Sequence, residues 1–261
     1  MDEKFLAQAD AGLVGWKDPA ARLKAALENN ELTLFCQPIR ALAGAPGYPM
    51  AEALVRLREE ETALLPPGEF LPVFEHYGMM PQLDRWVVRT ILRHLRKGSR
   101  MPRYTINVAS QTLDDPAFPG FVATETRTNG VAAAALAFEL DEADLLGKPQ
   151  ATARFAAAIR AAGCPVLLDG FGRRAVSFAP LKSVRADFIK VDGAITRKLL
   201  TSEIAVNKLK AIVRVGETLG IGVVGEFIEE EAVLVRLKAL GAGYAQGFGV
   251  YRPHPVDSLA T

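Results

Sequence analysis

Residues 136–169 read LAFELDEADLLGKPQATARFAAAIRAAGCPVLLD, with a short apolar segment on each side of an alanine-rich one. The apolar segments, Leu136–Leu140 and Pro165–Asp169, have the length of β-strands. The segment between them begins at Pro149 and ends before Gly163, and this placement of proline and glycine is typical of an α-helix. Two apolar strands joined by a helix predict a parallel β-α-β unit.

The same alternation continues along the rest of the chain. Proline, Asp or Ser caps and terminal glycines predict helices over 20–29, 67–77, 81–97, 149–162, 203–219 and 229–240. Strand-length apolar segments lie between most of them: Leu32–Pro38, Ala51–Arg56, Tyr104–Val108, Leu136–Leu140, Pro165–Asp169, Phe188–Val191, Gly222–Glu226 and Tyr244–Val250. Eight such strands in about 230 residues favour an α/β fold of the closed, TIM-like (β/α)8 barrel type over an open doubly wound sheet.

The composition excludes several classes of protein. The 261 residues are 49% hydrophobic with a formal net charge of +1, which argues against disorder and against coating a nucleic acid polymer or an anionic membrane. No apolar run reaches the ~18 residues of a membrane span, and the amino terminus lacks a secretory signal. Cys36 and Cys164 are expected to be reduced thiols. We therefore expect a soluble, cytoplasmic protein.

Polar residues interrupt the predicted strands, usually near the carboxyl end. A buried carboxylate costs several kcal/mol unless it is paired or bound to a metal, although any single one could also face solvent or form a local salt bridge. Because the strand ends of a barrel meet on one face, the whole set predicts an oxygen-rich site that suits Mg²⁺ or Mn²⁺. The three histidines lack the spacing of a zinc site. The polar residues are Glu52, Asn107, Glu139, Asp169, Lys190, Glu226 and Gln246.

One motif suggests a different ligand. Residues 170–175 read G-x-G-x-x-A after a strand, and Asp187 follows at about the distance of the ribose-binding acid of a dinucleotide site. However, Asp169 would place a carboxylate beside the pyrophosphate, and this strand is about the fifth rather than the first. We therefore set the nucleotide-cofactor interpretation aside.

Motifs along nearly the whole chain, from Arg22 to Leu259, resemble those of one family. In order, they are Gln37-Pro38-Ile39, Glu52-Ala53-Leu54-Val55-Arg56, Pro67–Pro72, Leu83–Trp86, Asn107–Ser110, Glu139–Glu142, Lys190-Val191-Asp192, Gly225–Glu229 and Gln246-Gly247-Phe248 with Pro253. This ordered set resembles the EAL family, whose members hydrolyse or bind cyclic di-GMP. The resemblance implies a modified eight-stranded α/β barrel with an antiparallel first strand. It also implies a two-metal hydrolysis of cyclic di-GMP to linear pGpG.

The resemblance further implies a role for each matching residue. Asp169 would bridge to a second metal, which Glu226 also binds. The catalytic pair would be Lys190, which contacts the attacking water, and Glu226, which helps to orient it. Glu142 would anchor the loop after the strand that ends at Asp169. Four donors would bind the first metal, namely Glu52, Asn107, Glu139 and Asp169. Ligand contacts would come from Gln37, Leu54, Arg56, Gln246 and Pro253.

One position departs from the family pattern. The family motif Asp-Asp-Phe-Gly-Thr-Gly stands here as Asp169-Gly170-Phe171-Gly172-Arg173-Arg174, so the second metal loses a carboxylate at Gly170. We expect binding of cyclic di-GMP with weak or absent turnover. An active phosphodiesterase and a protein-interaction module that has lost the ligand are the alternatives. If Gly170 is the only lesion, Gly170→Asp should raise turnover strongly.

Two further expectations concern the loop and the chain's organisation. Arg173 or Arg174 is hypothesised to reach into the space of the second metal and neutralise a ligand phosphate, the alternative being that both are solvated. Residues 1–16 are expected to be an N-terminal lead-in and residues 17–261 the EAL domain. Family resemblance leaves open a homodimer and a sensory, cyclase or effector partner.

Overall fold

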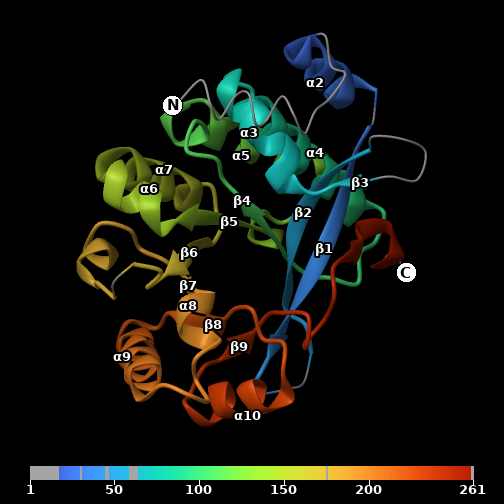
Figure 1. Cartoon of the computed structure of the whole chain (residues 1–261). Coiled ribbons are helices and arrows are strands. Elements are labelled where there is room, and N and C mark those ends of the chain that lie inside the picture. Colours follow the sequence, from blue (N-terminus) through green and yellow to red (C-terminus); the bar gives the residue numbers. More distant parts are fainter. Residues whose placement is uncertain (1–17, 30, 45–46, 59–63, 175, 260–261) are drawn as a thin grey trace.

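The structure is a computed structural model, which describes residues 18–29, 31–44, 47–58, 64–174 and 176–259 (Figure 1). The expected lead-in, residues 1–16, lies outside this part of the chain. No helix among the described residues is long and apolar enough to cross a membrane. Both cysteines, Cys36 and Cys164, are buried free thiols, as expected.

The strands form a closed mixed barrel, which confirms the predicted fold class. In barrel order the strands are β1 (Leu32–Ala41), β2 (Met50–Arg58), β4 (Tyr104–Asn107), β5 (Leu136–Asp141), β6 (Val166–Phe171), β7 (Phe188–Val191), β8 (Gly222–Gly225) and β9 (Tyr244–Ala245). From β2 to β9, neighbouring strands are parallel. The first strand, β1, is antiparallel to both β2 and β9 and closes the barrel between them, as expected. Two short strands, β3 (Leu64–Leu65) and β10 (His254–Pro255), extend the β1–β2 ribbon.

Helices surround the barrel and bury its outer face (Figure 1). Side chains such as Ile91, Phe155, Leu209 and Ile212 are almost fully buried in the main hydrophobic core, which also contains residues of the strands. The helices are α2 (Pro19–Glu28), α3 (Pro67–His76), α4 (Met80–Arg96), α5 (Phe118–Asn129), α6 (Glu142–Gly147), α7 (Pro149–Ala161), α8 (Gly193–Thr196), α9 (Glu203–Leu219) and α10 (Glu231–Ala239).

Two of the predicted helices begin at the capping residues that the sequence indicated. The side chains of Asp18 and Ser202 accept backbone N–H bonds at the starts of α2 and α9, as their sequence positions indicated. Helix α5 was not predicted, and its N-cap residue, Ala117, makes no side-chain cap bond. Helices α6 and α8 were also missed, because each is only a turn or two long.

The predicted strand Tyr244–Val250 is wrong beyond Ala245. The backbone at Gly247 has φ +152°, and it packs so closely on the backbone of Ile228 that no Cβ would fit there. Gly249 lies equally close to the backbone of Glu229. The chain therefore leaves the sheet after two strand residues and folds against the loop that follows β8.

A buried carboxylate joins α4 to the loop after β4. Asp84 is 4% exposed, and its Oδ2 accepts hydrogen bonds from the Ala109 amide at 3.0 Å and the Thr112 hydroxyl at 2.6 Å. Burial raises the pKa of Asp84 to about 6, although both hydrogen bonds and the charge of Arg85 act to lower it. The folded protein therefore takes up a proton at Asp84 more readily than the unfolded chain does.

This raised pKa predicts a stability that falls as the pH rises. The stabilisation that comes from protonated Asp84 is fully present below about pH 4, and it is lost as the pH rises through about 6. Asp84→Asn should remove this dependence, so that from pH 4 to pH 7 the variant gains up to about 3 kcal/mol in free energy of unfolding relative to the wild type. Urea denaturation across this range measures it, with Glu69→Gln on the surface of α3 as the control. Parallel pH profiles of Asp84→Asn and the wild type would contradict the prediction.

Candidate active site

The ammonium group of Lys190 lies inside the barrel among four carboxylates. Its Nζ is 2.7 Å from Glu139 Oε2, 3.0 Å from Glu52 Oε2, 3.1 Å from Glu226 Oε1 and 3.6 Å from Asp169 Oδ1. Lys190 and Glu139 are each 1% exposed. The structure therefore brings together five of the residues that the strand pattern singled out.

Amide side chains from β1, from β4 and from the segment after β9 extend this cluster. Asn107 Nδ2 donates to Glu52 Oε1 at 2.7 Å, and Gln246 Nε2 donates to Glu52 Oε2 at 2.6 Å. Gln246 also donates to Gln37 Oε1 at 3.1 Å, and Gln37 in turn donates to the carbonyl of Tyr251 at 2.9 Å. Glu52 is thus fixed by one ammonium and two amides, and it lies opposite Gln37 in the β1–β2 register.

The excess of negative charge alters the protonation of the cluster. Burial, together with the neighbouring carboxylates, raises the pKa of Glu139 and of Glu226 to about 8. Burial also acts to raise the pKa of Glu52, but the Lys190 charge and three hydrogen bonds outweigh it and lower the pKa. Burial acts to lower the pKa of Lys190, but the surrounding carboxylates raise it well above its usual value. One lysine therefore balances only part of the negative charge.

The donor set fits a hard divalent cation. As the side chains stand, no group of three or more His, Cys, Asp or Glu within the described part of the chain is arranged so that it could hold a metal ion. However, carboxylates outnumber the ammonium four to one, and two buried oxygens, Glu139 Oε1 and Asp169 Oδ1, accept no hydrogen bond. Carboxylate oxygens without donors are the ligands that Mg²⁺ and Mn²⁺ prefer.

A cavity of about 390 Å³ opens above this cluster. Predicted residues that line it are Gln37, Glu52, Leu54, Asp169, Lys190, Glu226 and Gln246. Four others are not in its lining: Asn107 and Glu139 contact lining residues, while Arg56 and Pro253 lie half-buried elsewhere. Arg56 donates to the Val55 carbonyl, and its guanidinium lies 5.5 Å from the centre of the Phe35 ring.

Five residues of the cavity wall were not among the predicted site residues: Arg197, Phe227, Glu229, Gly247 and Phe248. Phe227 is 46% exposed, has a left-handed backbone with φ +55°, and carries the Arg197 guanidinium 4.3 Å from its ring centre. Such a conformation is rare for a bulky residue. The signal in the sequence was Phe227 itself, a bulky aromatic residue within the Gly225–Glu229 motif.

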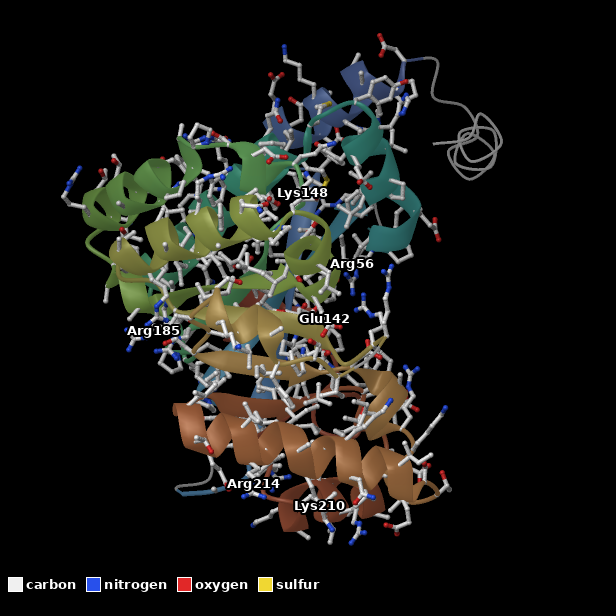
Figure 2. All side chains as sticks on the ribbon, turned by 90° about the vertical axis from the view of Figure 1, so that its left-hand side faces the viewer. Arg56, Glu142, Lys148, Arg185, Lys210 and Arg214 are labelled. Atoms are coloured by element: carbon white, nitrogen blue, oxygen red, sulfur yellow. The ribbon has the colours of Figure 1, made fainter. Side chains whose placement is uncertain are left out.

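The loop after β6 is anchored from the neighbouring strand. Both carboxylate oxygens of Glu142 accept from the Gly172 amide, each at 3.2 Å. These contacts join Glu142 to the backbone of the loop, and the anchoring role implied for it stays a prediction. In Figure 2, Glu142 and Arg56 lie at mid-height, above Lys210 and Arg214, which belong to α9.

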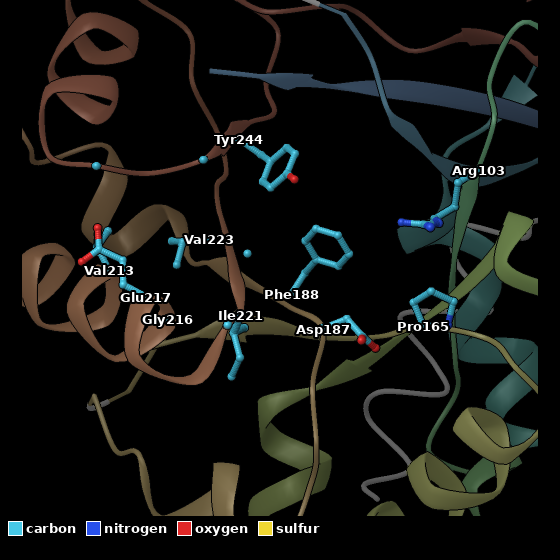
Figure 3. A pocket seen from close by; sticks show the side chains of 14 residues that line it. Arg103, Pro165, Asp187, Phe188, Val213, Gly216, Glu217, Ile221, Val223 and Tyr244 are labelled. Atoms are coloured by element: carbon cyan, nitrogen blue, oxygen red, sulfur yellow. The ribbon is translucent and has the colours of Figure 1, made fainter. Parts of the chain in front are cut away.

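A second hollow of about 560 Å³ lies at the opposite end of the barrel (Figure 3). Phe188 and Tyr244 meet there edge to face at 5.5 Å. Asp187 lies beside them, pairs with Arg160 and accepts from the Val166 amide at 2.8 Å. Asp187 therefore lies at the amino end of β7, away from the glycines at the carboxyl end of β6, so these residues do not form a dinucleotide site.

A closed α/β barrel with charged groups at the carboxyl ends of its strands is typical of barrel proteins whose ligand site lies at that end. The chain belongs to the EAL domain family, which matches residues 20–253. It is 28% identical over 242 residues to cyclic di-GMP phosphodiesterase PdeB of Shewanella oneidensis and 29% identical over 242 residues to cyclic di-GMP phosphodiesterase PdeF of Escherichia coli. These matches cover 92% and 91% of this chain but only 28% and 32% of the relatives.

Solved structures agree with the fold. The FimX EAL domain of Pseudomonas aeruginosa bound to c-di-GMP has a TM-score of 0.84 and 26% identity, over 90% of this chain and 96% of that one. The PaMucR phosphodiesterase in complex with c-di-GMP has a TM-score of 0.83 and 27% identity, over 92% and 99% of the two chains. Similar domains therefore bind this ligand in one protein described as a phosphodiesterase and in one described only by its domain.

Removing Lys190 should destabilise the fold. Lys190→Met leaves one buried and three half-buried carboxylates without their counter-charge, and we expect a loss of about 3–5 kcal/mol in free energy of unfolding, measured by urea denaturation in EDTA. The control is Lys148→Met, because the Lys148–Asp114 pair is exposed and should contribute below about 1 kcal/mol. Equal losses in the two variants would contradict this account of the cluster.

Truncating Glu52 should remove metal binding and leave the fold. In Glu52→Ala, Lys190 keeps three carboxylate partners, so the circular dichroism spectrum should be unchanged while calorimetric titration with MnCl₂ shows no binding. Glu125→Ala removes a surface carboxylate paired with Arg89 and serves as the control. Unfolding of Glu52→Ala would show instead that Glu52 is structural.

Proposed function

We propose that this chain binds cyclic di-GMP at a divalent-metal site in the cavity above Lys190, and that its turnover to pGpG is weak or absent. The observation that carries the proposal is the 390 Å³ cavity whose floor is the carboxylate cluster. An anionic dinucleotide does not suit such a floor by itself, because like charges repel. A bound cation reverses that relation, and the donor set suits one.

Each predicted residue has a task in this proposal. Glu226 and Lys190, 3.1 Å apart, would orient and contact the attacking water in any residual hydrolysis. When bound, a divalent cation would lower the pKa of such a water and offset the charge of the phosphate. The residues that would hold the first cation are Glu52, Asn107, Glu139 and Asp169. Those that would contact the nucleotide are Gln37, Leu54, Arg56, Gln246 and Pro253.

Weak turnover follows from what is missing beside Asp169. Gly170 offers no oxygen, so a second cation would have only Asp169 and Glu226 as carboxylate ligands. Two-metal hydrolysis needs both ions to activate the water and hold the leaving oxygen. Mg²⁺ accepts water ligands, so binding of the nucleotide survives this loss more readily than catalysis does.

An active phosphodiesterase is the second candidate. The observation in its favour is that Lys190 and Glu226 contact each other within a full set of first-metal residues, as the implied catalytic roles require. Two relatives named phosphodiesterases, each about a quarter to a third identical to this chain, support it as well.

One pair of measurements separates the candidates. The chain is incubated with cyclic di-GMP and MgCl₂ or MnCl₂, pGpG is read by chromatography, and binding is measured by calorimetry. We expect binding with little pGpG. Glu226→Gln controls for contaminating phosphodiesterase, because pGpG that persists in this variant does not come from this site.

The other outcomes each exclude the proposal. Rapid formation of pGpG that Glu226→Gln abolishes would establish the active phosphodiesterase. Absence of both binding and product would leave the protein-interaction module.

A further inference from the structure

The guanidinium of Arg173 fills the space in which a side chain at Gly170 would stand. A Cβ placed on Gly170 would lie 2.5 Å from Arg173 Nη2 and 2.9 Å from Cζ. Gly170 has φ +66°, at the point where the β6–β7 register is interrupted between Leu168 and Phe171. In the family motif this position is an aspartate of the second metal, so here an organic cation occupies the space of an acidic ligand.

Two neighbouring carboxylates hold Arg173 in this place. Its Nε donates to Asp192 Oδ2 at 2.9 Å, and its Nη1 donates to Asp141 Oδ2 at 3.2 Å. Each carboxylate uses its other oxygen as a helix cap: Asp141 Oδ1 accepts from Ala143 in α6, and Asp192 Oδ1 accepts from Ala194 in α8. The guanidinium is therefore held between the last residue of β5 and the first residue after β7, beside the end of β6.

One nitrogen of this guanidinium, Nη2, can still donate a hydrogen bond to a ligand. Among the described residues, Nη2 has no hydrogen-bond acceptor, and it is the nitrogen nearest to the missing side chain. Half of the Arg173 side chain is exposed. A fixed guanidinium with a free N–H is suited to a phosphate oxygen, because charge-assisted hydrogen bonds are the stronger ones.

We propose that Arg173 is the resident cation of the second half of this site: it excludes a second divalent ion and offers Nη2 to a phosphate of the nucleotide. The exclusion rests on Gly170 and Arg173 alone, whereas the phosphate contact rests on the proposed function. The residues present do not fit a second metal, since the carboxylate is absent and a positive charge stands in its place.

This arrangement changes what a restored carboxylate would do. In Gly170→Asp, the new carboxylate meets Arg173 Nη2 and pairs with it instead of binding a metal. The strong gain expected from Gly170→Asp alone therefore does not follow. Arg173 must be removed at the same time, and threonine is the residue that the family motif has at this position.

Counting bound Mn²⁺ tests the exclusion. Calorimetric titration with MnCl₂ should show one ion more per chain in the double variant Gly170→Asp/Arg173→Thr than in Gly170→Asp. The matched control is Gly170→Asp/Arg174→Thr, which should bind no additional ion because the atoms nearest to a Cβ on Gly170 all belong to Arg173 and not to Arg174. All variants carry the same aspartate at φ +66°, so its strain is common to them. A second ion in wild type or in Gly170→Asp, or no gain in the Arg173→Thr double variant, overturns the exclusion.

Binding of cyclic di-GMP at saturating MnCl₂ tests the phosphate contact without substitution at Gly170, because the residues proposed to hold the first cation are unchanged. Arg173→Ala should weaken this binding by about tenfold or more, the usual effect of losing a hydrogen bond to a charged group, and Arg174→Ala should leave it unchanged. Equal effects of the two substitutions overturn the contact. If wild type binds no cyclic di-GMP under any condition, the proposed function fails, while the Mn²⁺ counts still decide the exclusion.

Discussion

The ion pairs of Lys190 set the constraint on which the rest of the barrel depends. A single ammonium, almost wholly removed from water, contacts carboxylates from β2, β5 and β6 and from the loop after β8. Buried charges are tolerated only when they are paired and hydrogen-bonded, so each of these elements must bring its oxygen to the same point. The barrel therefore cannot shift the register of one strand without leaving a charge uncompensated.

The antiparallel first strand belongs to the same constraint. In the β1–β2 register Gln37 lies opposite Glu52, and Gln246 after β9 donates to both side chains. Because β1 closes the barrel between β2 and β9, it brings one more amide to the charged centre. Every strand of the closed barrel thus contributes a polar residue at or just beyond its span: Gln37, Glu52, Asn107, Glu139, Asp169, Lys190, Glu226 and Gln246.

The barrel and its charged centre could be predicted from the sequence because both leave periodic marks. Apolar strands between capped helices predicted the fold, and a polar residue in seven of the eight predicted strands marked the centre. The wall of the cavity could not be predicted in this way. Phe227 and Arg197 come from segments 30 residues apart, and their side chains meet where Phe227 has a left-handed backbone that its sequence does not indicate. The early end of β9 could not be predicted either, because it depends on close contacts of Gly247 and Gly249 with the backbone of Ile228 and Glu229.

Arg173 shows how a loss at one position changes the chemistry of its neighbours. Without a side chain at Gly170, nothing prevents the guanidinium from lying over the end of β6, where the caps of α6 and α8 already supply two carboxylates. These carboxylates raise the pKa of Arg173 above its already high usual value, the hydrogen bond to Asp192 being the largest cause, so its charge is permanent. A metal ion in this space would exchange with solvent, whereas a guanidinium anchored to two helix caps does not. On the proposal made above, Gly170 and Arg173 together replace an exchangeable charge by a fixed one, which suits holding a phosphate better than breaking its ester bond.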